Sequence, residues 1–226
     1  MIKILVASST DFEINPLLEF LQKNGKKISF FNYEYNNLSI YPLVTGVGAL
    51  QMAFAISRMG FNNSFDLAIN AGIGGAFQSR FPLGSVVHIH HDRFGDLGSE
   101  NADGSFSDLF EMGLLEANTF PYKNGWLYPK NKLNLTSGLT EVTGITVNKV
   151  LGKAESIAEV TQKYNPDIVS MEGAGFYYAS MMLDMNAIQI RAVSNLVEPR
   201  NKENWNIPLA IQQLNISLID LLQSIG

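Results

Sequence analysis

Two glutamates and an asparagine follow closely on short apolar runs of this sequence. Glu13, Glu172 and Asn195 each come after a run rich in β-branched residues, and a glycine-rich segment, AGIGGAF at residues 71–77, follows a fourth run. In open α/β sheets, ligands bind beyond the carboxyl ends of the strands. If the four runs are parallel strands, these segments converge on one sheet edge. A carboxylate there can accept hydrogen bonds or a proton, and an amide can donate and accept.

Each of these segments also has a purely structural interpretation. Glu13 could be a first-turn residue that the helix dipole stabilises. The glycines could form a tight turn, and Asn195 could cap a turn or a helix. Glu172 is harder to explain, because it lies between an apolar strand and the apolar segment GAGFYYASMML, where an unpaired carboxylate is costly. We therefore expect Glu172 to have a partner in the protein or in a ligand.

The sequence predicts no cofactor and no metal. The segments GIGG and TGVGAL both lack the GxGxxG spacing of a dinucleotide site, and no acidic residue follows GIGG about 20 positions on at a strand end. His88 and His90 share one face of an expected strand, because alternate residues of a strand point the same way. No carboxylate is spaced to complete a metal site with them, so we favour a structural or surface role for both and for His91.

The composition excludes several classes of protein. The chain has 226 residues, 46% hydrophobic and 16% charged, with a formal net charge of −5 and no Cys. This composition excludes a disordered chain, and the acidic balance argues against nucleic-acid binding, which needs a basic face. Without Cys, thiol nucleophiles, Cys-based zinc sites and disulfides are excluded. No apolar run has the length of a signal peptide core or a membrane span, so we expect a cytoplasmic protein without membrane contact.

Strand and helix patterns alternate along the chain. Apolar β-branched runs predict strands at residues 2–7, 29–32, 38–44, 67–70, 85–90, 140–147, 168–170 and 188–193. Helical spacing predicts helices at residues 14–21, 49–59, 154–164, 173–185 and 207–225. Residues 95–132 are expected to be irregular, with one short helix near residues 109–114. This pattern predicts a single three-layer α/β/α domain over residues 1–226, with helices on both faces of a central mixed, mostly parallel twisted sheet.

Together these segments resemble the nucleoside phosphorylase and nucleosidase family, and within it the futalosine hydrolases. The resemblance covers nearly the whole chain in order: Glu13 after the first strand, TGVG at 45–48, INAGIGGAF at 69–77, FGDLG at 94–98, GITVN at 144–148, SMEGAGF at 170–176, IRAVSN at 190–195 and Trp205. The Met-Glu pair and the Arg-Ala-x-Ser-Asn segment are the most specific markers of the family. The resemblance therefore implies the nucleoside phosphorylase-like fold.

The resemblance also implies a role for each marker residue. Breaking a purine N-glycosidic bond builds oxocarbenium character on the ribose and negative charge on the departing base, so the enzyme must activate a nucleophile, hold the sugar and donate to the base. By resemblance, Glu13 deprotonates the attacking water, Glu172 accepts hydrogen bonds from ribose hydroxyls, and Asn195 bonds the purine. Further substrate contacts fall on Met171 at the sugar face, Ile73 and Gly74 beside the base or sugar, Val147 and Asn148 around the base, Ser194, and Phe176.

Two departures from the family pattern favour hydrolysis of a 6-oxo purine nucleoside. Family phosphorylases hold an anion with an Arg after the first strand and an Arg near the glycine loop, whereas Glu13 follows the first strand here and residues 70–77 contain no Arg. A carboxylate would repel phosphate. Relatives that act on 6-amino purines generally carry Asp where this chain has Asn195, whose amide NH2 can serve the two acceptors, N7 and O6, of a 6-oxo purine.

The resemblance thus implies a nucleosidase that hydrolyses futalosine to hypoxanthine and dehypoxanthine futalosine, a step of menaquinone biosynthesis. Arg200 and Phe176 are candidates to hold the benzoate at the far end of that substrate. The alternatives are a methylthioadenosine/adenosylhomocysteine-type nucleosidase, a purine nucleoside phosphorylase, and a non-catalytic nucleoside-binding module. Because the family usually forms dimers or larger assemblies, a homodimer or higher homo-oligomer is expected.

Overall fold

The computed structural model describes residues 1–131 and 138–226. Its helices are α1 (Asp11–Asn24), α2 (Ala49–Asn62), α3 (Ala154–Tyr164), α4 (Gly173–Met182) and α5 (Ile207–Ile225), with a 3-10 turn, η1 (Lys202–Asn204), before α5. The main sheet consists of β1 (Ile2–Ser8), β2 (Lys26–Ser29), β3 (Asn32–Tyr35), β4 (Leu38–Val44), β5 (Leu67–Ala76), β6 (Val86–His91), β11 (Thr140–Thr146), β12 (Ile168–Ser170) and β13 (Ala187–Leu196). Two small hairpins pair β7 (Gly98–Glu100) with β8 (Phe106–Asp108) and β9 (Tyr122–Lys123) with β10 (Trp126–Leu127).

The main sheet is mixed and partly closed on itself. Its strand order is β12-β11-β6-β13-β5-β1-β4-β3-β2. The pairs β1–β4, β1–β5, β5–β13, β6–β11 and β11–β12 are parallel, whereas β2–β3, β3–β4 and β6–β13 are antiparallel. In addition, β12 pairs antiparallel with the end of β5, so the strands from β5 round to β12 close into a small barrel-like half. This closure places the start of β12, at Ile168 and Val169, against the end of β5.

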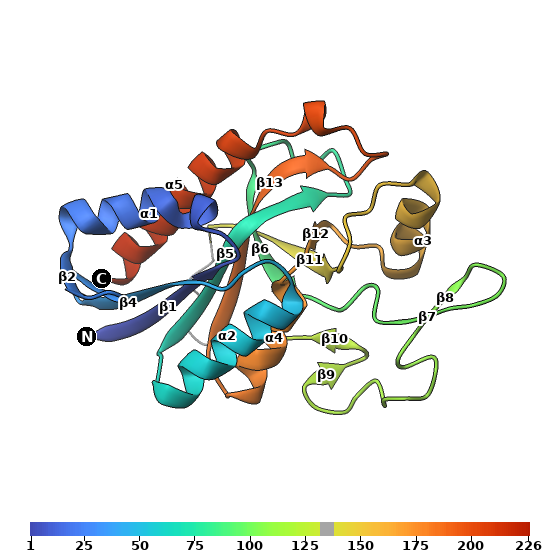
Figure 1. Cartoon of the computed structure of the whole chain (residues 1–226), viewed down its shortest axis with the longest axis horizontal. Coiled ribbons are helices and arrows are strands. Elements are labelled where there is room, and N and C mark those ends of the chain that lie inside the picture. Colours follow the sequence, from blue (N-terminus) through green and yellow to red (C-terminus); the bar gives the residue numbers. More distant parts are fainter. Residues whose placement is uncertain (132–137) are drawn as a thin grey trace.

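Helices cover both faces of the sheet, which confirms the predicted three layers (Figure 1). Helices α1 and α5 lie side by side on one face, where their leucines and isoleucines pack on β1, β5 and β13. Helices α2 and α4 pack on the other face around a second apolar cluster. They approach closely because Gly175 has no side chain: a Cβ there would lie 2.3 Å from the carbonyl oxygen of Ala49. None of the helices in the described ranges has the length and apolarity to cross a bilayer.

The predicted bounds of two helices match α3 and α5, whereas the helix predicted at residues 173–185 ends earlier, at Met182 of α4. The strand predicted at residues 67–70 is too short. Strand β5 instead runs straight through the glycines to Ala76. The reason is steric rather than conformational. A Cβ at Gly72 would lie 2.9 Å from Oε1 of Glu13, and one at Gly74 would lie 2.9 Å from the carbonyl oxygen of Val169. The glycines therefore let neighbouring segments approach the strand.

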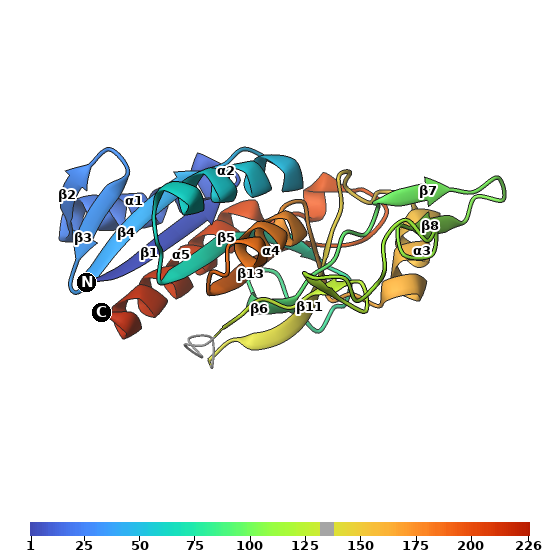
Figure 2. The ribbon, with the colours of Figure 1, turned by 90° about the horizontal axis from the view of Figure 1, so that it is seen from below.

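The short helix predicted near residues 109–114 is also absent. The carboxylate of Asp108 caps a single turn by accepting the backbone N–H groups of Phe110 and Glu111 at 3.0 Å each, and the turn ends at Gly113, whose φ is 68°. Asp108 also forms a buried ion pair with Arg93 at 2.7 Å. These contacts tie the segment to the sheet, and Figure 2 shows the β7–β8 hairpin beside α3, at the end of the molecule opposite both chain termini. Lys132, the last residue of the region predicted as irregular, lies outside the described residues.

Candidate active site

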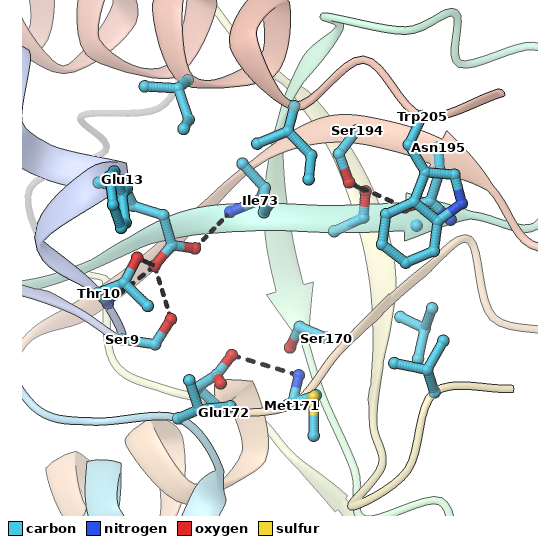
Figure 3. A pocket seen from close by; sticks show the side chains of 18 of the residues that line it. Ser9, Thr10, Glu13, Ile73, Ser170, Met171, Glu172, Ser194, Asn195 and Trp205 are labelled. Atoms are coloured by element: carbon cyan, nitrogen blue, oxygen red, sulfur yellow. Dashed lines mark hydrogen bonds between the residues drawn. The ribbon is translucent and has the colours of Figure 1, made fainter. Parts of the chain in front are cut away.

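A cavity of about 990 Å³ opens at the carboxyl ends of β1, β12 and β13 and along the final part of β5. The segments that carry Glu13, the glycines of residues 71–77, Glu172 and Asn195 were predicted to converge at one sheet edge, and they do converge at this cavity (Figure 3). The predicted residues in its wall are Glu13, Ile73, Gly74, Val147, Met171, Glu172, Ser194 and Asn195. Figure 3 shows the carboxylates of Glu13 and Glu172 turned toward the same space, with Asn195 and Trp205 at its other end.

The carboxylate of Glu13 is the most heavily hydrogen-bonded group of the cavity wall. Glu13 is only 6% exposed. Its Oε2 accepts from the hydroxyls of Ser8 at 3.0 Å, Ser9 at 2.6 Å and Thr10 at 3.0 Å, and from the backbone N–H of Thr10 at 3.0 Å. Among the residues that the structure describes, its Oε1 accepts a single hydrogen bond, from the N–H of Ile73 at 3.1 Å. One oxygen is therefore an anchor, and the other retains capacity to accept a further proton donor.

Local sequence explains this geometry. Thr10 is the N-cap of α1, and Glu13 stands at the third helical position, where a glutamate reaches back to the N–H of the cap residue. The structural interpretation of Glu13 as a first-turn residue is thus correct, and it is compatible with a role in the cavity. The N–H of Ile73 is available because β5 passes directly alongside at its glycines.

Glu172 lies at the start of α4, 7% exposed, and also has partners in the protein. Its Oε1 accepts the N–H of Gly48 at 3.0 Å, and its Oε2 lies 3.3 Å from the N–H of Met171. Burial raises the pKa of the Glu172 carboxyl above its ordinary value, and the nearby charge of Glu13 raises it further, whereas the charge of Arg191 and the N–H of Gly48 lower it. Glu172 lines the cavity, where a hydroxyl-bearing ligand could donate hydrogen bonds to the remaining lone pairs of its carboxylate.

A buried polar network around Asp92 connects the sheet to the first turn of α4. Asp92 is 1% exposed; its Oδ1 accepts from the hydroxyl of Thr146 at 2.9 Å and the N–H of Arg93 at 2.8 Å, and its Oδ2 accepts from Nε2 of Gln189 at 3.0 Å. The Thr146 hydroxyl in turn accepts the N–H of Ala174 in the first turn of α4. Burial raises the pKa of Asp92 from its ordinary 3.8 to about 6, although the Gln189 and Thr146 hydrogen bonds oppose the change.

This network predicts a pH-dependent stability that Asp92→Asn removes. Because the pKa of Asp92 is raised in the folded state, the resulting contribution to stability is complete below about pH 4 and is lost as the pH rises through about 6. Urea unfolding should therefore show the wild-type free energy of unfolding falling by roughly 3 kcal/mol more than that of the variant between pH 4 and pH 7. The variant amide can pair with Oε1 of Gln189, which has no partner among the described residues. Parallel pH profiles for the two proteins would contradict this assignment.

Asn195 reaches the cavity because β13 is irregular at this point. The register with β5 shifts between Val193 and Asn195, so that the strand bulges at Ser194 and turns the next side chain toward the cavity. The hydroxyl of Ser194 lies 2.8 Å from Oδ1 of Asn195, and Nδ2 of Asn195 donates to the carbonyl oxygen of Leu196 at 2.9 Å. With Oδ1 occupied, the second N–H of the amide remains to donate to a ligand.

Two predicted contact residues lie elsewhere. Phe176 is completely buried in the core cluster between α2 and α4, because its position on α4 faces the sheet; its predicted contact with substrate is therefore wrong. Asn148 is outside the cavity wall, and both its backbone N–H and its side chain donate to the carboxylate of Asp96. Its neighbours Val147 and Leu151 take the expected place in the wall.

The histidines take structural positions. His88 is 3% exposed, and burial lowers its pKa to about 4, with Nδ1 3.7 Å from a carboxylate oxygen of Glu141. His90 and His91 contact each other and the ring of Tyr128. Among the described residues, no group of three or more His, Asp or Glu side chains is placed to hold a metal ion.

Arg191 belongs to the marker segment IRAVSN, but the sequence suggested no role for it. It is 1% exposed in β13, and its Nη1 donates to Oδ1 of Asn70 and to the carbonyl oxygen of Ile190, each at 3.1 Å. A Cβ at Gly72 would lie 3.3 Å from this Nη1 and 2.9 Å from Oε1 of Glu13, so the cation lies close behind the cavity wall. A charged residue within the apolar run IQIRAV was the signal, the same one that identified Glu172.

The cavity wall is poorly suited to an inorganic anion. Three glutamates, Glu13, Glu172 and Glu198, belong to the wall, whereas Arg191 lies outside it. Arg200 supplies the cationic side chain of the wall as far as the structure describes it. Most of the remaining wall is apolar, including residues of α1 and α5 such as Phe12 and Ile211. The arrangement favours a neutral, hydroxyl-bearing ligand with a flat polar ring near Asn195 and an extended apolar part.

Comparison with known proteins matches the chain to the phosphorylase superfamily and finds relatives among the futalosine hydrolases. The sequence profile of the phosphorylase superfamily matches residues 2–222. A futalosine hydrolase of Streptomyces coelicolor is 31% identical over 157 residues, which span 66% of this chain and 62% of that protein. A futalosine hydrolase of Thermus thermophilus is 28% identical over 229 residues, which span 98% of this chain and 96% of that protein.

A solved structure shows the same fold. The 5'-methylthioadenosine/S-adenosylhomocysteine nucleosidase from Neisseria meningitidis, in complex with methylthio-immucillin-A, superposes with a TM-score of 0.83. The match covers 99% of this chain and 100% of that chain at 17% sequence identity. At this identity, the similarity shows the fold alone, which is the nucleoside phosphorylase-like α/β architecture predicted from the sequence.

Proposed function

Because this chain belongs to the phosphorylase superfamily, we propose that it is a purine nucleosidase that hydrolyses the N-glycosidic bond of futalosine and releases hypoxanthine. Glu13 is the general base for the attacking water, Glu172 binds the ribose hydroxyls, and Asn195 donates to the departing base. Met171 and Ile73 line the space between these groups. The futalosine hydrolases among its relatives support this substrate, and the geometry of the site supports the reaction.

The observation that carries the proposal is the position of Glu13. Its Oε2 is anchored by four donors, while Oε1 keeps accepting capacity toward a cavity whose facing wall holds Glu172. A general base needs a fixed oxygen within hydrogen-bond distance of the water that it activates. A phosphorylase would have to place phosphate against this carboxylate, which Coulomb repulsion opposes in a buried site.

The test is hypoxanthine release from futalosine in phosphate-free buffer, followed by chromatography. Hydrolysis predicts a rate that is independent of added phosphate. Cleavage only in the presence of phosphate would establish a phosphorylase and overturn the proposal. Ligand-induced thermal stabilisation without any base release would establish a nucleoside-binding protein instead.

Asn195→Asp is expected to shift base preference from 6-oxo toward 6-amino purine nucleosides. The Asn195 amide can donate to the acceptors of hypoxanthine, whereas a carboxylate can only accept unless it is protonated. Loss of one such bond is worth roughly tenfold, so we expect the ratio of kcat/KM for inosine over adenosine to fall at least about tenfold. Ser194→Ala, which removes the hydroxyl beside Oδ1, is the control for simple disturbance of the strand end. An unchanged ratio in Asn195→Asp would mean that the base is read elsewhere.

Arg200→Ala tests the substrate more narrowly. Arg200 lies in the cavity wall and is the group there that could pair with the benzoate of futalosine. Because the side chain is exposed, the expected loss is modest: KM for futalosine should rise about tenfold, while KM for inosine, which has no carboxylate, stays within about twofold. Equal effects on the two substrates would remove Arg200 from substrate recognition.

A methylthioadenosine/adenosylhomocysteine-type nucleosidase is the second candidate. The apolar extension of the cavity over Phe12 and Ile211 would also accept a methylthio group. A panel of futalosine, inosine and methylthioadenosine separates the two candidates by their kcat/KM values. We further propose a homo-oligomer, because α2 exposes the apolar side chains of Leu50, Phe54 and Phe61 to solvent. Light scattering of the purified protein tests this.

A further inference from the structure

Asn215 is a buried polar residue on the apolar face of α5. It is 2% exposed and lies beside Leu214 and Leu218, which belong to the apolar cluster between α5, α1 and the sheet. Both N–H groups and the oxygen of its carboxamide form hydrogen bonds. Nδ2 donates to the backbone carbonyl oxygen of Glu13 at 2.8 Å and to that of Ile211 at 2.7 Å, and Oδ1 accepts the backbone N–H of Leu17 at 3.0 Å.

The two α1 groups that Asn215 contacts form a matched pair. In a regular α-helix, the carbonyl of one residue accepts the N–H of the residue four positions later, which here joins Glu13 to Leu17. Asn215, about two hundred residues further along the chain, offers a donor to that carbonyl and an acceptor to that N–H. Pro16 lies in the same turn and has no N–H, so the helix is already one backbone donor short there. A side chain that hydrogen-bonds to both backbone groups, in a turn that contains a proline, fixes the local direction of the helix axis.

We propose that Asn215 is a positioning residue for Glu13, an inference that rests on the proposed role of Glu13 as the general base. Asn215 fixes the backbone of Glu13 to α5, while the loop after β1 and the N–H of Ile73 fix its carboxylate. Glu13 is thus held at both ends by different elements. A shift of about 1 Å in a catalytic group can cost on the order of a hundredfold in rate, so this anchoring matters for turnover.

An asparagine meets this requirement where similar side chains do not. Leucine has nearly the same size but neither bonds the carbonyl of Glu13 nor the N–H of Leu17. Aspartate keeps the acceptor for Leu17 but sets a second oxygen against the Glu13 carbonyl. The Asn215→Leu and Asn215→Asp variants therefore both remove the donation to Glu13, and only the former also removes the acceptor.

The experiment tests, independently of activity, whether the Glu13 carboxylate still accepts its hydrogen bond from Ile73. Amide hydrogen exchange is recorded for Ile73, whose N–H bonds Oε1 of Glu13, in the wild type, Asn215→Leu and a control, Leu222→Ala, which removes a buried side chain of α5 outside the cavity wall. We expect exchange at Ile73 to be at least about tenfold faster in Asn215→Leu, and unchanged in Leu222→Ala under conditions where both remain folded. Nucleosidase kcat should fall at least about tenfold in Asn215→Leu, with KM within about twofold.

Several outcomes would overturn the proposal. Unchanged exchange at Ile73 in Asn215→Leu overturns it whatever the activity, and a raised KM with unchanged exchange would assign Asn215 to direct substrate contact instead. If Asn215→Leu does not fold, Asn215→Asp is measured in its place, with the same expected acceleration and the same refuting result. If the wild type hydrolyses no purine nucleoside, the proposed function fails, while the exchange experiment still decides whether Asn215 positions Glu13.

Discussion

Replacing Glu13 with glutamine is expected to lower kcat for hypoxanthine release at least about a hundredfold while substrate still binds. A neutral amide cannot take the proton of the attacking water. The amide must also direct its NH2 group toward N–H and O–H donors, because Ser8, Ser9, Thr10 and Ile73 all donate to this carboxylate. Steady-state release of hypoxanthine gives kcat, and ligand-induced thermal stabilisation reports binding.

The matched control for this variant is Glu19→Gln. Glu19 lies on the same helix but is exposed, and the same loss of one negative charge there should leave kcat unchanged. This comparison separates loss of the general base from any effect of the altered net charge. A kcat for Glu13→Gln within a few-fold of the wild type would remove Glu13 from the mechanism.

Replacing Glu172 with glutamine is expected to lower kcat/KM by about 10² to 10³. Hydrogen bonds to a charged acceptor contribute roughly 1.5–3 kcal/mol each, and the proposed role gives Glu172 bonds from the ribose hydroxyls. The amide retains one oxygen for the N–H of Gly48, so the fold around α2 and α4 should survive. The effect should be on kcat/KM, because these bonds strengthen as positive charge develops on the sugar.

A double-mutant cycle with the substrate tests this role directly. With 2',3'-dideoxyinosine, which lacks both hydroxyls, the wild type should lose about as much kcat/KM as Glu172→Gln loses with inosine, and the variant should lose little more. Additive losses would show that Glu172 does not bind the hydroxyls. Because burial raises the pKa of Glu172, wild-type kcat/KM should also decline with falling pH in a range above that of an ordinary glutamate, a decline absent from the variant.

The sequence predicted the layers of the fold well because they depend on local patterns. Helix α5 repeats Ile and Leu at helical spacing between an asparagine cap and the chain end, and its predicted bounds match the structure. Strand β5 was predicted too short, because the glycines after residue 70 were expected to lie in a loop. Their actual use, the close approach of Glu13 and Val169, depends on segments distant in the chain. The helix predicted near residues 109–114 is absent because the single turn that Asp108 caps ends at Gly113, whose φ of 68° lies outside the helical region.

The residues of the candidate site also divide into those that a local sequence pattern reveals and those that only the tertiary structure places. Glu13, Glu172 and Asn195 could be found from the sequence, because each interrupts or ends an apolar run, and all three lie in the cavity wall. Phe176 could not be placed correctly, because helical spacing leaves open which face of α4 meets the cavity and which meets the core. Asn195 faces the cavity only through the bulge at Ser194, a register shift that no local pattern shows.

The sequence by itself determined which groups could do the chemistry and the order in which they occur along the chain, since a polar residue in an apolar run is visible locally. Only the tertiary structure decided how those groups are held. The N–H of Ile73 on the Glu13 carboxylate, the cation of Arg191 behind Gly72 and the amide of Asn215 on the Glu13 backbone all join residues far apart in the chain. Such contacts depend on which helices and strands pack together, and the periodicity of one segment does not show which other segments it will contact.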